Sequence, residues 1–128
     1  MGSSKRSIET SKGSSVMKII SIDDDKLNFP YIHNIDVLQE KFDLLFTTAR
    51  LMGYIMLKDY IGSKDLKKIY YYFHSEEAAN RISVMVNFHI LEGEVKKVVL
   101  VTSTNRMVFE EGHEEDLLKE LDKMLLYL

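Results

Sequence analysis

The chain has 128 residues, of which 45% are hydrophobic and 29% charged, and its formal net charge is −3 at pH 7. These values are typical of one packed domain and exclude a disordered protein. The chain has no cysteine, which excludes disulfides, thiol catalysis and cysteine-ligated metal centres. The negative charge argues against a surface built to bind nucleic acid.

The N-terminal 16 residues differ in composition from the rest. They are rich in serine, and Ile8 is the only large aliphatic residue before Val16. We predict that residues 1–16 are a disordered tail or an added leader, and that residues 17–128 form a single domain. No signal peptide and no apolar run of about 18 residues is present. We therefore expect a cytoplasmic protein without a membrane partner.

The first elements are a short strand and a long helix. Lys18–Ile22 is apolar enough for a strand, and the three aspartates Asp23–Asp25 end it before a loop that contains Pro30. Asn34 is a suitable N-cap for the helix, and Gly53 is suited to end it. Apolar residues at spacings of three and four form its main stripe: Ile35, Leu38, Phe42, Leu45, Ala49 and Met52. A second row comprises Val37, Leu44 and Leu51, so we expect a mostly buried helix.

A run of strands follows this helix. Residues 82–90 alternate strictly between apolar and polar side chains, and Glu92-Gly93 is typical of a tight hairpin leading back into residues 95–101. The consecutive apolar residues 98–101 predict a central strand covered on both faces. The other strands are expected at residues 54–61, 67–74 and 106–109, and a last helix at about residues 114–127.

The resulting order is β-α-β-β-β-β-β-α. Because consecutive strands with short links pair antiparallel, the pattern predicts an α+β fold. We expect an antiparallel sheet of about five strands with a long N-terminal helix on one face. The C-terminal helix is expected beside the first helix or on the other face.

The face of the sheet away from the first helix is predicted to be unusual. With Ile55, Leu57 and Ile61 directed inward, the alternation places tyrosine, methionine and histidine on the opposite face, where lysine, glutamate, serine and threonine are usual. The predicted binding surface consists of Tyr54, Met56, Tyr60, Tyr70, Tyr72, Met85 and His89.

Three interpretations of this surface remain open. The C-terminal helix covers it and makes it core, or a second copy or another protein binds it, or its tyrosines stack on bases or a flat ligand. The last interpretation needs positive charge nearby. The lysines that could supply this charge are Lys58, Lys64, Lys67, Lys68, Lys96 and Lys97.

Catalytic motifs are not found. The chain has no GxSxG sequence, phosphate-binding loop or HExxH sequence. His74 and His89 would form a metal or general-base site if they faced each other across adjacent strands, and Asp23–Asp25 could hold a hard cation. We expect neither arrangement, and we predict no catalytic residue, metal or cofactor.

The sequence therefore favours a small binding or regulatory protein that contacts another protein or forms a homodimer. The first alternative is a nucleic-acid- or nucleotide-binding protein that uses the same tyrosines with the lysines. The second alternative is a metal-assisted hydrolase that uses His74, His89 and Asp23–Asp25.

Overall fold

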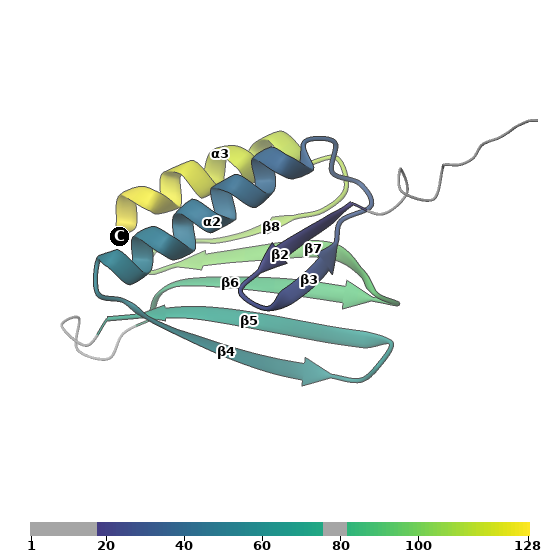
Figure 1. The fold of residues 1–128 in the computed structure, drawn as a ribbon, viewed down its shortest axis with the longest axis horizontal. Coiled ribbons are helices and arrows are strands. Elements are labelled where there is room, and N and C mark those ends of the chain that lie inside the picture. The colour runs from purple at the N-terminus through teal and green to yellow at the C-terminus, as the bar shows by residue number, and fades with distance from the viewer. Residues whose placement is uncertain (1–17, 76–81) are drawn as a thin grey trace, which may run out of the picture.

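The computed structural model describes residues 18–75 and 82–128 and has an α+β architecture with one strongly curled sheet (Figure 1). The predictions for residues 1–16 and for the connection at residues 76–80 lie outside this part of the chain. No helix in the described part is long and apolar enough to cross a membrane.

The two helices form where the sequence predicts them. Helix α2 spans Ile35–Leu51, and helix α3 spans Glu114–Met124 and continues into the 3₁₀ turn η3 at Leu125–Tyr127. Asn34 precedes α2 without capping it through its side chain. The Glu114 carboxylate accepts hydrogen bonds from the backbone N–H groups of His33, at 3.0 Å, and Asn34, at 2.7 Å. One side chain thus joins the first turn of α3 to the start of α2.

Five consecutive strands form the main part of the sheet. They are β4 (Ile55–Gly62), β5 (Leu66–His74), β6 (Ile82–Leu91), β7 (Glu94–Thr102) and β8 (Arg106–Phe109). Each pairs antiparallel with the next, which confirms the α+β fold and the antiparallel pairing. In the described residues the sheet has seven strands, so the predicted number of about five was too small.

Of the two further strands, the first lies where a strand was predicted, and the second lies in a segment that was predicted to be a loop. Strand β2 (Ile19–Ile22) pairs antiparallel with β3 (Asp25–Asn28), and Ile22 lies opposite Asp25. The turn needs only Asp23 and Asp24, and Asp23 adopts a positive φ of 57°, which aspartate tolerates better than most residues. Strand β3 joins the rest of the sheet through a single parallel pair, Asn28 with Glu94 of β7.

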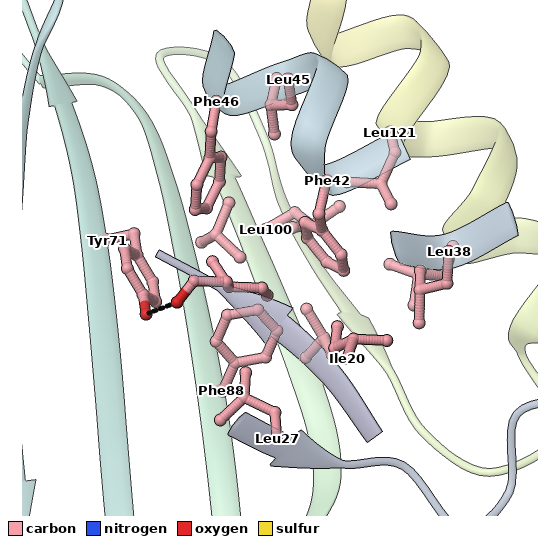
Figure 2. Close-up of a cluster of buried hydrophobic side chains, with 14 of the residues drawn as sticks. Ile20, Leu27, Leu38, Phe42, Leu45, Phe46, Tyr71, Phe88, Leu100 and Leu121 are labelled. Atoms are coloured by element: carbon pink, nitrogen blue, oxygen red, sulfur yellow. Dashed lines mark hydrogen bonds between the residues drawn. The ribbon is translucent and has the colours of Figure 1, made fainter. Parts of the chain in front are cut away.

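The core lies on one face of the five antiparallel strands, which we call the inner face. Two phenylalanines of α2 pack on it (Figure 2). The ring centroid of Phe42 lies 5.5 Å from that of Phe88, and the ring centroid of Phe46 lies 5.2 Å from that of Tyr71. The β2–β3 hairpin covers part of the same face through Ile20 and Leu27, which are buried in the same cluster (Figure 2). Helix α3 lies beside α2 (Figure 1) and contributes Leu117, Leu121 and Met124 to this core. Both helices and the hairpin therefore cover the inner face.

One row of α2 was predicted incorrectly. Val37, Leu44 and Leu51 are exposed, with exposed fractions of 39%, 51% and 82%. Only the main stripe of α2 faces the sheet. Helix α3 does not cover Val37, Leu44 and Leu51. The helix is therefore half buried rather than mostly buried.

Candidate binding surface

The face opposite the helices, which we call the outer face, is defined by the strand registers. In an antiparallel pair, residues opposite each other lie on the same side of the sheet. Because Ile69, Tyr71 and Phe73 face the core, their neighbours in β5 face outward. The registers then extend the outer face over β4 to β8. Its residues are Ile55, Leu57, Asp59, Ile61, Leu66, Lys68, Tyr70, Tyr72, His74, Met85, Asn87, His89, Leu91, Glu94, Lys97, Val99, Val101, Arg106 and Val108.

The registers place four of the predicted surface residues together on this face, namely Tyr70, Tyr72, Met85 and His89. Whether they bind a partner stays a prediction. The other three do not belong to this face. Met56 and Tyr60 lie opposite Phe73 and Ile69, which face inward, and Tyr54 packs against the core before β4 begins.

The orientation predicted for β4 was therefore wrong. Leu57 and Ile61 face outward, and Lys58 faces inward opposite Tyr71. Alternation shows that a strand has two different faces, but it does not show which face is covered. In β4 the difference in polarity between the two faces is small, because this edge strand has no fully buried residue.

The outer face exposes large apolar side chains. The exposed fractions are 51% for Leu57, 54% for Ile61 and 38% for Val108. Tyr70 and Tyr72 stand side by side between them, with ring centroids 5.9 Å apart and ring planes only 9° from parallel. No helix of the described residues lies on this face, as Figure 1 shows.

The centre of the outer face is buried by neighbouring side chains. Val99 is only 1% exposed and Asn87 only 7%. These two residues lie opposite each other on β7 and β6, and Tyr70 lies opposite Asn87 on its other side. The Oδ1 atom of Asn87 is buried and accepts no hydrogen bond from the described residues. Such an unsatisfied acceptor costs about 1–3 kcal/mol.

A cationic row crosses one end of the outer face. We define it as Lys68, His89 and Lys97, which lie opposite one another on β5, β6 and β7. Burial and the positive charges of Lys68, Lys97 and Arg106 hold the pKa of His89 below its usual value of 6.5. The Nε2 atom of His89 is buried without a hydrogen-bond partner among the described residues. The row therefore consists of two positively charged lysines with a histidine between them whose Nε2 atom lacks a hydrogen-bond partner.

A polar cluster on the inner side anchors the β2–β3 hairpin. Asp25 accepts hydrogen bonds from the hydroxyls of Tyr71 and of Tyr60, the latter at 3.0 Å, and forms an ion pair with Lys58 at 2.6 Å. Tyr71 also donates to the Ile22 carbonyl at 3.2 Å.

The contacts of this cluster shift the pKa values of its members. Burial would raise the pKa of Asp25, but the hydrogen bonds from Lys58, Tyr71 and Tyr60 outweigh it and hold this pKa below 3.8. Burial and Asp25 raise the pKa of Tyr71 well above its usual value of 10.0. Sequence reasoning missed this cluster because its members are distant in sequence and the hairpin itself was not predicted.

The residues of the predicted metal-assisted alternative are not brought together. His89 lies opposite Lys68, and His74 lies opposite Ile82, which separates the two histidines by about six residues, or roughly 20 Å, along the strands. Asp25 belongs to the inner cluster instead. Among residues 18–75 and 82–128, no group of three or more histidine, aspartate and glutamate side chains is placed to hold a metal ion.

Comparisons of the chain with protein-family models, with curated proteins and with solved structures give no match.

Proposed function

We propose that this protein acts by binding another protein through the outer face of its sheet, without catalysis. The observation that supports this most strongly is the exposure of apolar residues from both edge strands of that face. Leu57 and Ile61 lie on β4 and Val108 lies on β8, with tyrosine and methionine side chains between them. A face of this kind is typical of a contact surface, since apolar residues exposed over several neighbouring strands gain free energy when a partner removes them from water.

The composition of the face favours a protein over a nucleic acid. Tyrosine and methionine are enriched at protein interfaces. Base stacking requires aromatic rings with their faces free. Tyr70 and Tyr72 are stacked on each other at 5.9 Å, so each ring already has one face occupied by the other.

A matched pair of substitutions tests the proposal. Leu57 on the outer face and Leu44 on α2 are the same residue type, and each is 51% exposed. We would tag the full chain, isolate it from cells of its own host with its bound partner, and measure the partner retained by Leu57→Lys and Leu44→Lys. Both variants should remain folded, because substitutions of exposed residues usually change stability by about 0.5 kcal/mol or less.

The expected result is a partner protein bound to the wild type in fixed stoichiometry. Leu57→Lys should weaken this binding at least tenfold, and Leu44→Lys should leave it unchanged. Equal retention by the wild type and Leu57→Lys would contradict the proposal, as would loss of the partner in Leu44→Lys alone.

A further inference from the structure

We infer that the partner presents carboxylates to the cationic row, so that the outer face recognises an acidic protein surface with apolar side chains beside the carboxylates. This inference rests on the proposed function and specifies the chemistry of the partner. It is carried by three observations: the charge of the outer face, the unpaired histidine within it, and the position of the exposed apolar residues next to the row.

The charges of the outer face are unbalanced. Lys68, Lys97 and Arg106 are cationic, and Asp59 and Glu94 are the carboxylates among the residues that define the face. The chain as a whole has a net charge of −3, and α3 alone carries five carboxylates against two lysines. The face that the helices leave uncovered thus carries more cations than carboxylates in a chain that is acidic overall, which is the arrangement that complements an acidic partner.

The row contains a group that lacks a partner. His89 lies between Lys68 and Lys97, and its buried Nε2 atom has no hydrogen-bond partner among the described residues. A carboxylate placed over the row accepts hydrogen bonds from the ammonium groups of Lys68 and Lys97, neutralises the repulsion between these two lysines and favours the protonated form of His89. Charge-assisted hydrogen bonds of this kind are about twice as strong as neutral ones.

The apolar residues lie close enough to act together with the row. Ile61 is opposite Lys68 on β4 and extends the row. The next row of side chains, toward the centre of the face, consists of Asp59, Tyr70, Asn87 and Val99. A single extended segment crossing the strands would therefore meet cationic and apolar side chains in succession. A binding partner that matches these two adjacent rows would carry both carboxylates and apolar residues.

A second copy of the chain fits this face less well. Two outer faces packed together would bring two sets of Lys68, Lys97 and Arg106 into one interface with only the carboxylates of Asp59 and Glu94 to balance them. Like charges placed together at an interface cost several kcal/mol. The charge distribution therefore favours a different, acidic protein over a homodimer.

The test uses the full chain labelled with ¹⁵N and three matched peptides. The peptides alternate leucine with glutamate, with glutamine or with lysine, and a single-stranded oligothymidine serves as a nucleic-acid probe. Backbone amide shifts locate the binding, and calorimetry gives the affinity. The variant Lys68→Gln/Lys97→Gln is compared with Lys119→Gln/Lys123→Gln, which removes the same charge from α3.

We expect the glutamate peptide to shift the amides of Tyr72, His89 and Lys97, and to bind about tenfold more tightly than the glutamine peptide, a difference of 1.4 kcal/mol. The Lys68→Gln/Lys97→Gln variant should lose this preference, and the α3 variant should keep it. Equal binding of all three peptides at the outer face would overturn the acidic preference while leaving the proposed function intact. Absence of any shift there, or tighter binding of the oligothymidine than of the glutamate peptide, would also overturn the inference. The Leu57 and Leu44 comparison tests the proposed function separately.

Discussion

Asp25 shows how one side chain holds two parts of the fold together. Its carboxylate, on the β2–β3 hairpin, binds Lys58 of β4 and Tyr71 of β5, and only 15% of its side chain is exposed. Because the donors favour the charged form, Asp25 stabilises the folded protein while it is ionised. This interaction compensates for the single residue pair that joins β3 to the rest of the sheet.

The substitution Asp25→Asn should lower the free energy of unfolding by about 2 kcal/mol, because Lys58 and two tyrosine hydroxyls lose a charged acceptor. Urea denaturation at pH 7 measures this loss. Asp24→Asn, in the same turn but exposed, is the control and should change stability by about 0.5 kcal/mol or less.

The effect of Asp25→Asn should depend on pH. The pKa of Asp25 is lower in the folded state than the usual 3.8, so its contribution is complete above that value and is lost as the pH falls below it. The stabilities of the wild type and Asp25→Asn should therefore converge at acidic pH. A difference that stays constant from pH 7 to below 3.8 would contradict an ionic role for this residue.

His89 gives the outer face a predicted pH dependence. Burial and the charges of Lys68 on β5, Lys97 on β7 and Arg106 on β8 lower its pKa. A bound carboxylate acts in the opposite direction and raises the pKa of His89. The complex then holds more protons than the free protein, so binding of the glutamate peptide should strengthen as the pH falls from 7 toward about 5.5.

Calorimetry across this pH range, with His89→Gln and His33→Gln as variants, measures the effect. His89→Gln should flatten the dependence, and His33→Gln, at an exposed position before α2, should retain it. The same slope in the wild type and in His89→Gln would show that His89 does not take part.

At the scale of the elements, strong periodic patterns predicted the structure well. The alternation in β6 correctly placed Val84, Val86 and Phe88 in the core. The main stripe of α2 correctly identified its buried face, except for Met52, which lies beyond the end of the helix and is 60% exposed. These patterns are reliable because burial on one side of a strand or helix imposes its period on the sequence. The α+β class and the antiparallel pairing followed from them.

Weak patterns and long-range pairing account for the errors. Strand β3 has only Leu27 as an apolar residue, and it forms because the hairpin packs on Phe88 and Tyr71 of distant strands (Figure 2). The register of β4 with β5, which sets the outward direction of Leu57, is likewise a contact between strands. Neither feature is encoded in the local sequence. The central strand β7 was predicted to be covered on both faces, but Val99 is buried on the outer face by neighbouring side chains alone.

The turn between β4 and β5 supplies a test at this scale. Gly62 has a positive φ of 123°, and a Cβ atom there would lie 2.9 Å from the Cα of Lys67 and closer still to the Leu66 carbonyl oxygen. Gly93, in the turn between β6 and β7, also has a positive φ, of 83°, but no atom lies within 4 Å of such a Cβ. Both glycines therefore need a positive φ, but only at Gly62 would an added Cβ atom clash with the backbone.

We expect Gly93→Ala to destabilise the protein by about 1–2 kcal/mol, from the left-handed conformation alone. Gly62→Ala should cost at least about twice as much, since backbone atoms must also move. Thermal and urea denaturation of both variants measure the difference. Equal destabilisation would mean that the close packing at the β4–β5 turn is not present in solution.

At the scale of the whole molecule, the two sides of the sheet are covered to different extents. The inner face carries both helices and the hairpin, and it contains nearly all of the buried apolar residues. The outer face has no covering layer in the described residues, and its cations contrast with the acidic surface of α3. We therefore expect the protein to meet its partner with the sheet and to keep the acidic helices in solvent.

The most direct measurement is site-specific photo-crosslinking in cells of the protein's own host. A photoreactive amino acid would replace Leu57 or Val108 on the outer face, or Leu44 on α2, all of which are exposed. Our account predicts one and the same protein adduct from Leu57 and Val108, and none from Leu44. An adduct from Leu44 alone, or no adduct at either outer-face position, would contradict it.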